Sequence, residues 1–193
     1  MWLRANVLLS LTTDIEWCSE DQIKAIFDLA DSYGVPLFPF VTHESNFLKA
    51  RGGEQGIHPN FLPGSTHGRT EDEVLEHCLR LVPGVTASRS HCFYSNTRLL
   101  WKMAERGIRA DANLLTYMDY RKPFKNVGGF TTFPTYWSDD VALRRGEGFD
   151  KRNMGNNGVR VVNVHPLNYD QPVVKELFAF ARLRSVPFES LYA

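Results

Sequence analysis

Short apolar runs alternate with amphipathic stretches along this chain, and the alternation limits the folds that it can adopt. Five runs are apolar enough to form buried strands, at residues 7–11, 35–41, 85–87, 108–115 and 159–164. Apolar residues at helical spacing fill much of the sequence between them. Alternating strands and helices predict an α/β fold with a mainly parallel sheet, either open or closed into a barrel.

Sequence signals mark where several helices begin and end. Residues 19–22 and 70–73 have the capping-box pattern that opens a helix. The first of these helices is expected to stop at Gly34, and the second before Pro83-Gly84. Two further helices are predicted, at residues 97–105 and 173–183.

The length and charge of the chain exclude some classes of protein. We expect residues 1–193 to form a single domain. A domain of this size buries roughly 70% of its unfolded surface, so it needs neither metal nor disulfides merely to fold. The 22 basic and 22 acidic residues give a formal net charge of zero. This balance argues against a nucleic-acid-binding protein, which depends on clustered lysine and arginine.

The three cysteines, Cys18, Cys78 and Cys92, are widely spaced and form neither a zinc-binding Cys-x-x-Cys pair nor a disulfide framework. We therefore expect reduced thiols in a cytoplasmic protein. Residues 1–9 are apolar but interrupted by polar side chains, which favours a first strand over a signal peptide. No apolar run approaches the ~20 residues that cross a bilayer, so no membrane span is expected.

Polar residues follow most of the predicted strands. In parallel α/β folds, ligands bind at the C-terminal ends of the strands. We therefore expect the following side chains on one face of the sheet: Asp14, Glu16, His43, His58, Arg89, His91 and His165.

These residue types can support metal-assisted hydrolysis. Of the two acids Asp14 and Glu16, one can bind a divalent ion while the other accepts a proton from water. His58 and one further imidazole would complete a mixed nitrogen and oxygen site that suits zinc. His165 could protonate a leaving amine. Taken singly, each histidine is more often a polar loop residue, and only the coincidence at strand ends favours a site.

Five short motifs occur in order along the chain. They are Thr12-Thr13-Asp14-Ile15-Glu16-Trp17, Gly56-Ile57-His58-Pro59-Asn60-Phe61, Arg89-Ser90-His91, Trp137-Ser138-Asp139-Asp140 and Val164-His165-Pro166. Together they resemble the motifs of the polysaccharide deacetylases (NodB homology domain, carbohydrate esterase family 4). The resemblance runs from Thr12 to Asn168 and is nearest to the WbmS-like branch, which is associated with bacterial surface-polysaccharide clusters.

The resemblance implies a deformed (β/α) barrel that is compact and need not be complete. It also implies metal-dependent removal of an N-acyl group, expected to be N-acetyl, from an amino sugar. At the matching positions, Asp14 resembles the catalytic base, Glu16 the acidic metal ligand and His58 the first metal histidine. Arg89 resembles the arginine that orients the base.

The resemblance likewise makes His165 the general acid, braced by Asp139 or Asp140. Trp17 and Trp137 lie beside motif residues and are candidates for a sugar-stacking wall, although core packing is an equal expectation.

The chain departs from the family pattern at the second metal histidine, where it has Leu62. The replacement could be His67, His91 or an oxygen of Asn60. We favour His67 because the loop that carries it can reach the site.

For three other residues, the sequence gives only weak indications of a role. His43 is expected to be structural or to support the site, and His77 is given no role. Cys92 is expected to be buried and unreactive, because no base is placed to activate it.

Two other functions compete with the deacetylase. A sugar-binding relic of the same fold could have lost its metal, and the missing second histidine keeps this alternative open. A two-metal phosphoester hydrolase would need more acidic ligands than the sequence offers.

Overall fold

The computed structural model describes residues 7–155 and 157–193. Its strands are β1 (Leu8–Asp14), β2 (Leu37–Val41), β3 (Gly56–Ile57), β4 (Ala87–Ser88), β5 (Ala110–Asp111), β6 (Phe124–Lys125), β7 (Thr131–Thr132), β8 (Thr135–Ser138) and β9 (Val159–Val164). Its α-helices are α1 (Glu20–Tyr33), α2 (Asn46–Arg51), α3 (Glu71–Leu81), α4 (Thr97–Glu105), α5 (Asp139–Arg144) and α6 (Pro172–Ala181). Short 3₁₀ turns are η1 (His91–Phe93), η2 (Lys151–Met154), η3 (Pro166–Asn168) and η4 (Glu189–Leu191). The part of the predicted first strand within residues 1–6 lies outside the described residues.

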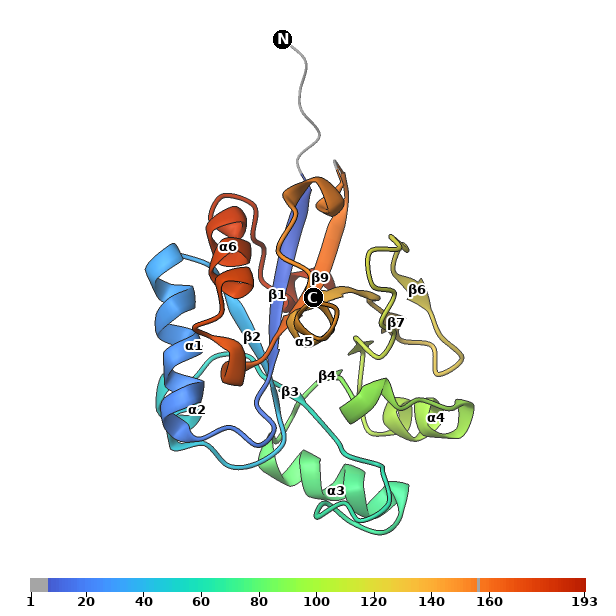
Figure 1. Cartoon of the computed structure of the whole chain (residues 1–193). Helices are drawn as coiled ribbons and strands as arrows, with labels where there is room; N and C mark the ends of the chain where they lie inside the picture. Colours follow the sequence, from blue (N-terminus) through green and yellow to red (C-terminus); the bar gives the residue numbers. More distant parts are fainter. Residues whose placement is uncertain (1–6, 156) are drawn as a thin grey trace.

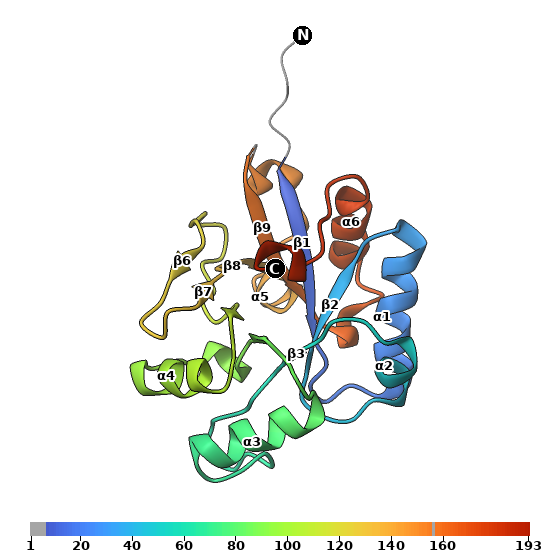
Figure 2. The same ribbon diagram turned by 180° about the vertical axis from the view of Figure 1, so that it is seen from behind.

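The strands form one curled sheet in the order β6-β7-β5-β4-β3-β2-β1-β9-β8 (Figures 1 and 2). Neighbouring strands are parallel except for β6 and β7. The segment after β5 reaches β8, where Thr135 N donates to Leu114 O (2.7 Å) and Thr116 N donates to Thr135 O (2.9 Å). These bonds connect the segment after β5 to β8, which is at the far end of the sheet order, and the curled sheet with this connection confirms the predicted deformed α/β barrel.

Both predicted capping boxes are present. Gln22 N donates to Ser19 Oγ (3.3 Å), and Ser19 N donates to Gln22 Oε1 (2.9 Å). Thr70 and Glu73 make the same reciprocal pair at the start of α3. Helix α1 ends at Gly34, whose φ of 66° is easily adopted only by glycine. Local sequence therefore determines the ends of these helices.

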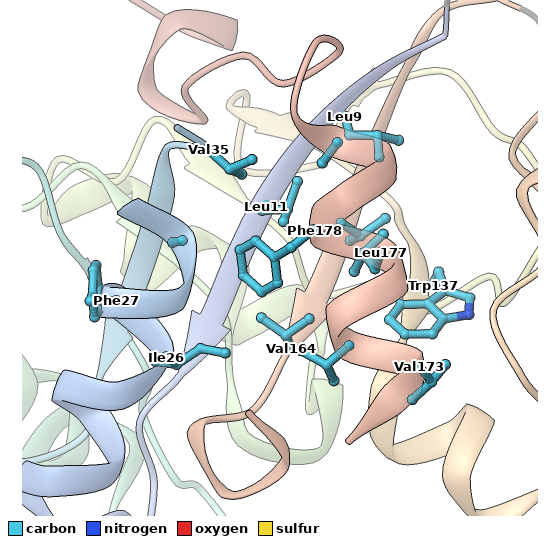
Figure 3. Packing of buried hydrophobic residues seen from close by; sticks show 14 of the residues in the cluster. Leu9, Leu11, Ile26, Phe27, Val35, Trp137, Val164, Val173, Leu177 and Phe178 are labelled. Carbon is cyan, nitrogen blue, oxygen red and sulfur yellow. The ribbon is translucent and has the colours of Figure 1, made fainter. Parts of the chain in front are cut away.

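A hydrophobic core lies between β1 and the helices α1 and α6 (Figure 3). Leu9 and Leu11 of β1 are fully buried in it, together with Phe178 of α6. Because side chains alternate along a strand, Thr12 and Asp14 point to the other face of β1. The core thus fixes β1 and turns its polar residues toward the inside of the barrel.

Several strands are shorter than the apolar runs that predicted them. The run at 108–115 contributes only Ala110–Asp111 to the sheet and one isolated bridge at Leu115, because the chain turns away to meet β8. The sequence signals also did not separate the helices α2 and α5, or the strands β3, β6, β7 and β8, from loops. Within residues 7–155 and 157–193, no helix has the length and apolar character needed to cross a membrane.

Candidate active site

A buried arginine and an asparagine hold Asp14 at the C-terminal end of β1. Arg89 Nη1 donates to Asp14 Oδ1 (3.0 Å) and to Asn163 Oδ1 (2.6 Å), and Asn163 Nδ2 donates to Asp14 Oδ2 (2.8 Å). Arg89 Nη2 donates to Thr12 Oγ1 (2.6 Å). Both carboxylate oxygens of Asp14 are therefore fixed by donors.

The charge of Asp14 follows from this arrangement. Burial alone would raise its pKa, but Arg89, followed by His58 and His165, outweighs burial and holds the pKa below its usual range. Asp14 is therefore an ionised carboxylate at neutral pH, although it is almost completely buried.

Sequence reasoning missed Asn163. It is a buried polar residue in the otherwise largely apolar strand β9, two residues before His165 and hence on the same face. That alternation was visible in the sequence and could have identified it.

Glu16, His58 and His91 come together from three separate segments. Each offers one ligand atom, and these atoms lie within 4.8 Å of one another. His58 Nε2 is 3.1 Å from Glu16 Oε2, and His91 Nδ1 also contacts this oxygen. Burial alone would raise the pKa of Glu16, but its contacts with the two imidazoles hold the pKa well below the usual range.

This group fits a metal ion. A carboxylate with two imidazoles is a donor set typical of catalytic zinc. His91 Nδ1 is buried and has no hydrogen-bond partner among the described residues, although it lies against Glu16. Buried polar nitrogens normally have partners, so a nitrogen without one beside two other donors is what a metal ligand requires.

Parallel pairing of β3 and β4 brings the two histidines together. Ile57 is paired with Ser88, so that the residues directly after these strands are neighbours. His91 N then donates to Pro59 O (2.9 Å), which ties the loop of His91 to the segment of His58.

The preference for His67 as the replacement ligand does not agree with this geometry. His67 Nδ1 accepts a hydrogen bond from Asn60 N (3.1 Å), and its ring stacks on that of His77. Asn60 Oδ1 accepts from Leu62 N (3.0 Å). Of the three alternatives, the group contains only His91, because the loop of His67 folds against α3 instead.

His165 and Asp139 lie on the opposite side of Asp14. His165 Nδ1 is 2.6 Å from Asp139 Oδ1, and His165 N donates to Asp139 Oδ2 (2.8 Å). Asn168 Nδ2 donates to the same Oδ2 (3.0 Å). The other ring nitrogen, Nε2, lies 3.9 Å from Asp14 Oδ2. Asp139 therefore orients the ring and leaves Nε2 toward Asp14.

Asp139 also determines the charge of His165. Burial alone would lower the pKa of His165, but the carboxylate of Asp139 outweighs burial and raises it from 6.5 to about 9. Asp140 has a different role: it accepts hydrogen bonds from Ser138 Oγ and Arg144 Nη2. Of the two aspartates, Asp139 has the bracing position.

The two tryptophans differ. Trp17 is 73% exposed and lies edge-on to His91, with ring centroids 5.1 Å apart. Trp137 is only 1% exposed and belongs to the hydrophobic core (Figure 3). Of the two alternatives for Trp137, core packing is therefore correct and the sugar-stacking wall is wrong, because β8 turns this side chain into the core.

The expectation that Cys92 is buried is wrong, although the raised pKa of its thiol agrees with an unreactive residue. The residue is exposed, and its Sγ lies 3.2 Å from His91 Nε2. Partial burial and the nearby Glu16 raise the pKa of Cys92 above the usual range, so that it is a neutral thiol. The exposure arises because Cys92 has a φ of 53° in the tight turn that presents His91.

Most of these side chains, although neither Asp139 nor Trp137, border one cavity of about 260 Å³, which we call the catalytic cavity. The metal-ligand group lies along one side, with Trp17 at its rim, and His165 lies along the other, with Leu167 at its rim. Asp14 and Arg89 also line it. Such a barrel with this constellation is typical of metal-dependent deacetylases of the NodB type.

Comparison with known proteins identifies the family. Residues 11–170 match the family model of the WbmS-like polysaccharide deacetylases. The chain therefore belongs to this family, as its motifs predicted. Among curated proteins, none matches the chain.

Solved structures agree with the family. The chain is similar to WbmS of Bordetella bronchiseptica, described as a polysaccharide deacetylase involved in O-antigen biosynthesis, with a TM-score of 0.75 and 28% identity over 95% of this chain and 86% of that one. A polysaccharide deacetylase structure from Mycobacterium smegmatis has a TM-score of 0.67 and 16% identity over 99% and 91% of the two chains. The peptidoglycan N-acetylglucosamine deacetylase Bc1960 has a TM-score of 0.52 and 12% identity over 100% and 90%. The last two share the fold alone.

Proposed function

We propose that this chain is a metal-dependent hydrolase that removes an N-acyl group, in the first instance N-acetyl, from an amino sugar in surface-polysaccharide biosynthesis. One observation carries the proposal. A carboxylate and two imidazoles converge beside an aspartate held by arginine, and a braced histidine lies opposite. The groups that amide hydrolysis needs thus border a single cavity.

Glu16, His58 and His91 would hold one divalent ion, and their donor atoms suit zinc best. When bound, such an ion polarises an amide carbonyl and makes water more acidic. The single carboxylate in this group is too few acidic ligands for a two-metal phosphoester hydrolase.

Asp14 would accept the proton of the attacking water. Arg89 and Asn163 hold both of its oxygens, so the carboxylate cannot rotate away from the cavity. Its low pKa keeps it ionised and ready to accept a proton at neutral pH.

His165 would give a proton to the departing amine. An amine leaves a tetrahedral intermediate readily only when it is protonated. With a pKa of about 9, His165 is an imidazolium at neutral pH, and Asp139 occupies its other nitrogen. The proton on Nε2 is then available on the side of Asp14.

A sugar-binding relic without a competent metal site is the second candidate. It drew its support from Leu62, where the family usually has the second histidine. The position of His91 beside Glu16 and His58 weakens that support, because a third ligand is available from another segment.

Metal content and acetate release test the proposal. The protein is purified without chelators, its metal is measured by elemental analysis, and acetate release is followed from N-acetylhexosamines in free, nucleotide-linked and oligomeric form. We expect about one zinc per chain, and acetate release that a chelator stops and added zinc restores. Sugar binding without metal or acetate release would support the relic, and activity that is insensitive to chelators would contradict the metal site.

A further inference from the structure

The segment that carries His91 is tied to the neighbouring segment by a side chain where a backbone hydrogen bond would be expected. In the parallel pair of β4 and β5, Ala112 N donates to Ser88 O (3.0 Å). The next bond of a regular parallel ladder would run from Ser90 N to Ala112 O. Ser90 N instead donates to Oδ1 of Asn113 (2.5 Å). The side chain of Asn113 therefore takes the place of a backbone acceptor.

The backbone acceptor is lost because the barrel closes at this point. Ala112 O accepts a hydrogen bond from Thr135 Oγ1 of β8 (3.1 Å), and Leu114 O accepts from Thr135 N (2.7 Å). The segment after β5 therefore turns from β4 toward β8, and Ser90 loses its backbone partner. Asn113 lies between these two carbonyl groups, and its amide oxygen is an acceptor that reaches across the gap.

Asn113 and the group that it binds are both buried. Asn113 is 6% exposed and Ser90 is 1% exposed. A buried backbone N–H that lacks a partner is costly, so the chain depends on this hydrogen bond more than on one at the surface.

The amide of Asn113 has one orientation. Its Oδ1 accepts from Ser90 N, which leaves Nδ2 for the other side. Buried Asp111 lies on that side: burial raises the pKa of its carboxyl to about 6, although contacts with Thr132 and Asn113 lower it. An amide lowers the pKa of a carboxyl only through its N–H groups, so Nδ2 faces Asp111.

Ser90 begins the tight turn that presents His91. Phe93 N donates to Ser90 O (2.9 Å), and Cys92 and Phe93 have φ values of 53° and 55°. Residues other than glycine rarely adopt this left-handed backbone, and they keep it only where surrounding contacts hold the chain. The hydrogen bond from Ser90 N to Asn113 is one such contact, at the residue directly before His91.

The functional residues on either side of Ser90 depend on this bond to different extents. Arg89 is held independently, because its guanidinium makes three hydrogen bonds with buried side chains. The ring of His91 lies against Glu16, but its Nδ1 makes no hydrogen bond of normal geometry in the described part of the chain. Loss of the bond to Asn113 should therefore displace His91 more than Arg89.

We propose that Asn113 is a positioning residue for the metal-ligand group: its side-chain oxygen holds the turn that presents His91. This inference rests on the proposed function, because it names a residue that assembles the proposed metal site. Among the described residues, Asn113 is not one of those that border the catalytic cavity. It acts through the backbone of Ser90 and touches neither substrate nor metal.

The zinc affinity of the full chain tests this role and is measured by competition with a zinc-binding dye. Asn113→Leu fills nearly the same space but removes the acceptor. It should weaken zinc binding by about 10–100-fold, the range for residues that support a metal ligand. Acetate release at limiting zinc should fall with it and return at excess zinc, because Asp14 and His165 are held by other side chains.

Asn126→Leu is the matched control. Asn126 also accepts a hydrogen bond from a backbone N–H, that of Gly128 (2.9 Å), but it lies in the turn between β6 and β7. Urea unfolding measures how much stability each variant loses. Asn126→Leu should leave zinc affinity unchanged, whatever stability it loses.

An exchange of two residues tests the oxygen itself. The double variant Asn113→Asp with Asp111→Asn keeps an acceptor for Ser90 N and keeps one carboxylate and one amide in the pair. It should bind zinc at least about tenfold more tightly than Asn113→Leu, a difference within the range of coupling between contacting residues. If Asn113→Leu does not fold, Asn113→Ala, which leaves room for water at Ser90 N, takes its place in the comparison.

The outcomes separate this role from the deacetylase function. Three results would overturn the role and leave the deacetylase intact: unchanged zinc affinity in Asn113→Leu, an equal loss in Asn126→Leu, or no recovery in the double variant. Zinc binding that depends on Asn113, without acetate release from any N-acetylated sugar, would overturn the deacetylase function and support the role. A wild-type protein that binds no zinc would overturn both.

Discussion

The two sides of the catalytic cavity differ in how completely their polar atoms are hydrogen bonded. On the acid side, both oxygens of Asp139 are occupied by His165 and Asn168, so the ring is held without any ligand. On the metal side, His91 Nδ1 is buried and lies against Glu16, but it makes no hydrogen bond of normal geometry in the described part of the chain. The acid side is therefore held by the chain's own hydrogen bonds, whereas the metal side keeps a buried nitrogen for which an ion would be a partner.

Asp14 lies between the two sides, and its substitution gives the largest expected effect. Asp14→Asn should reduce kcat by roughly 10²–10⁴-fold, because it removes the proton acceptor. Zinc content should be unchanged if Glu16 is the ligand and Asp14 the base. Elemental analysis of the purified variant checks this, and loss of zinc together with activity would mean that the two acids have exchanged roles.

The metal side can be tested by a pair of histidine substitutions. His91→Ala should weaken zinc binding by at least about 100-fold, because even residues that only support a metal ligand contribute 10–100-fold. His67→Ala is the matched change and should leave zinc affinity unaffected, since its nitrogen is bonded to Asn60 N. Competition with a zinc-binding dye measures both affinities. If His67→Ala releases the metal and His91→Ala does not, the group Glu16, His58 and His91 is not the zinc site.

Asp139→Asn tests the acid side. Without the carboxylate, the pKa of His165 should fall from about 9 toward its ordinary value of 6.5 or below. The imidazolium fraction at pH 8 then drops, and kcat at that pH should fall by about 30-fold, with little loss at pH 6. Asp140→Asn, the control, should leave the basic limb of the pH–rate profile in place. A basic limb that does not move in Asp139→Asn would show that His165 is not the titrating acid.

The same pair predicts a pH dependence of stability. The pKa of His165 is raised on folding, so the stabilisation from its pairing with Asp139 is fully present below pH 6.5 and is lost as the pH rises through about 9. The free energy of unfolding should therefore decline over this window in the wild-type protein and decline less in Asp139→Asn. Urea unfolding at several pH values measures the difference, and parallel profiles would contradict it.

The two sides also differ in how far sequence could predict them. His165 follows a long apolar strand, and Asp139 is adjacent to it through the pairing of β8 with β9. The third residue of the candidate metal group was harder to predict, because His58 and His91 are brought together by the register of β3 and β4. These strands have only two residues each, too few to show a register in their hydrophobic pattern.

The direction in which a buried side chain points was the second feature that the sequence did not predict. All four residues of β8 are buried, so no alternation of polar and apolar residues shows which way Trp137 points. Trp17 lies beyond the end of β1, in a turn where its φ is 55°, and this turn leaves the side chain exposed. Helix ends, by contrast, depend on local capping and were predicted to the residue at Ser19 and Thr70.

The smallest expected effects on kinetics come from Trp17 and Leu167, which lie at the two rims of the catalytic cavity. Trp17→Ala should raise KM for an N-acetylated sugar by about 3–10-fold, the value of one aromatic contact, without changing kcat. Leu167, 48% exposed at the rim of the acid side, offers less flat surface, and Leu167→Ala should raise KM by less than about threefold. Initial-rate kinetics on zinc-loaded variants measure both. Since Trp17 also lies edge-on to His91, zinc content is the control, and a fall in kcat with loss of zinc would make Trp17 a support for the metal ligand instead of a sugar contact.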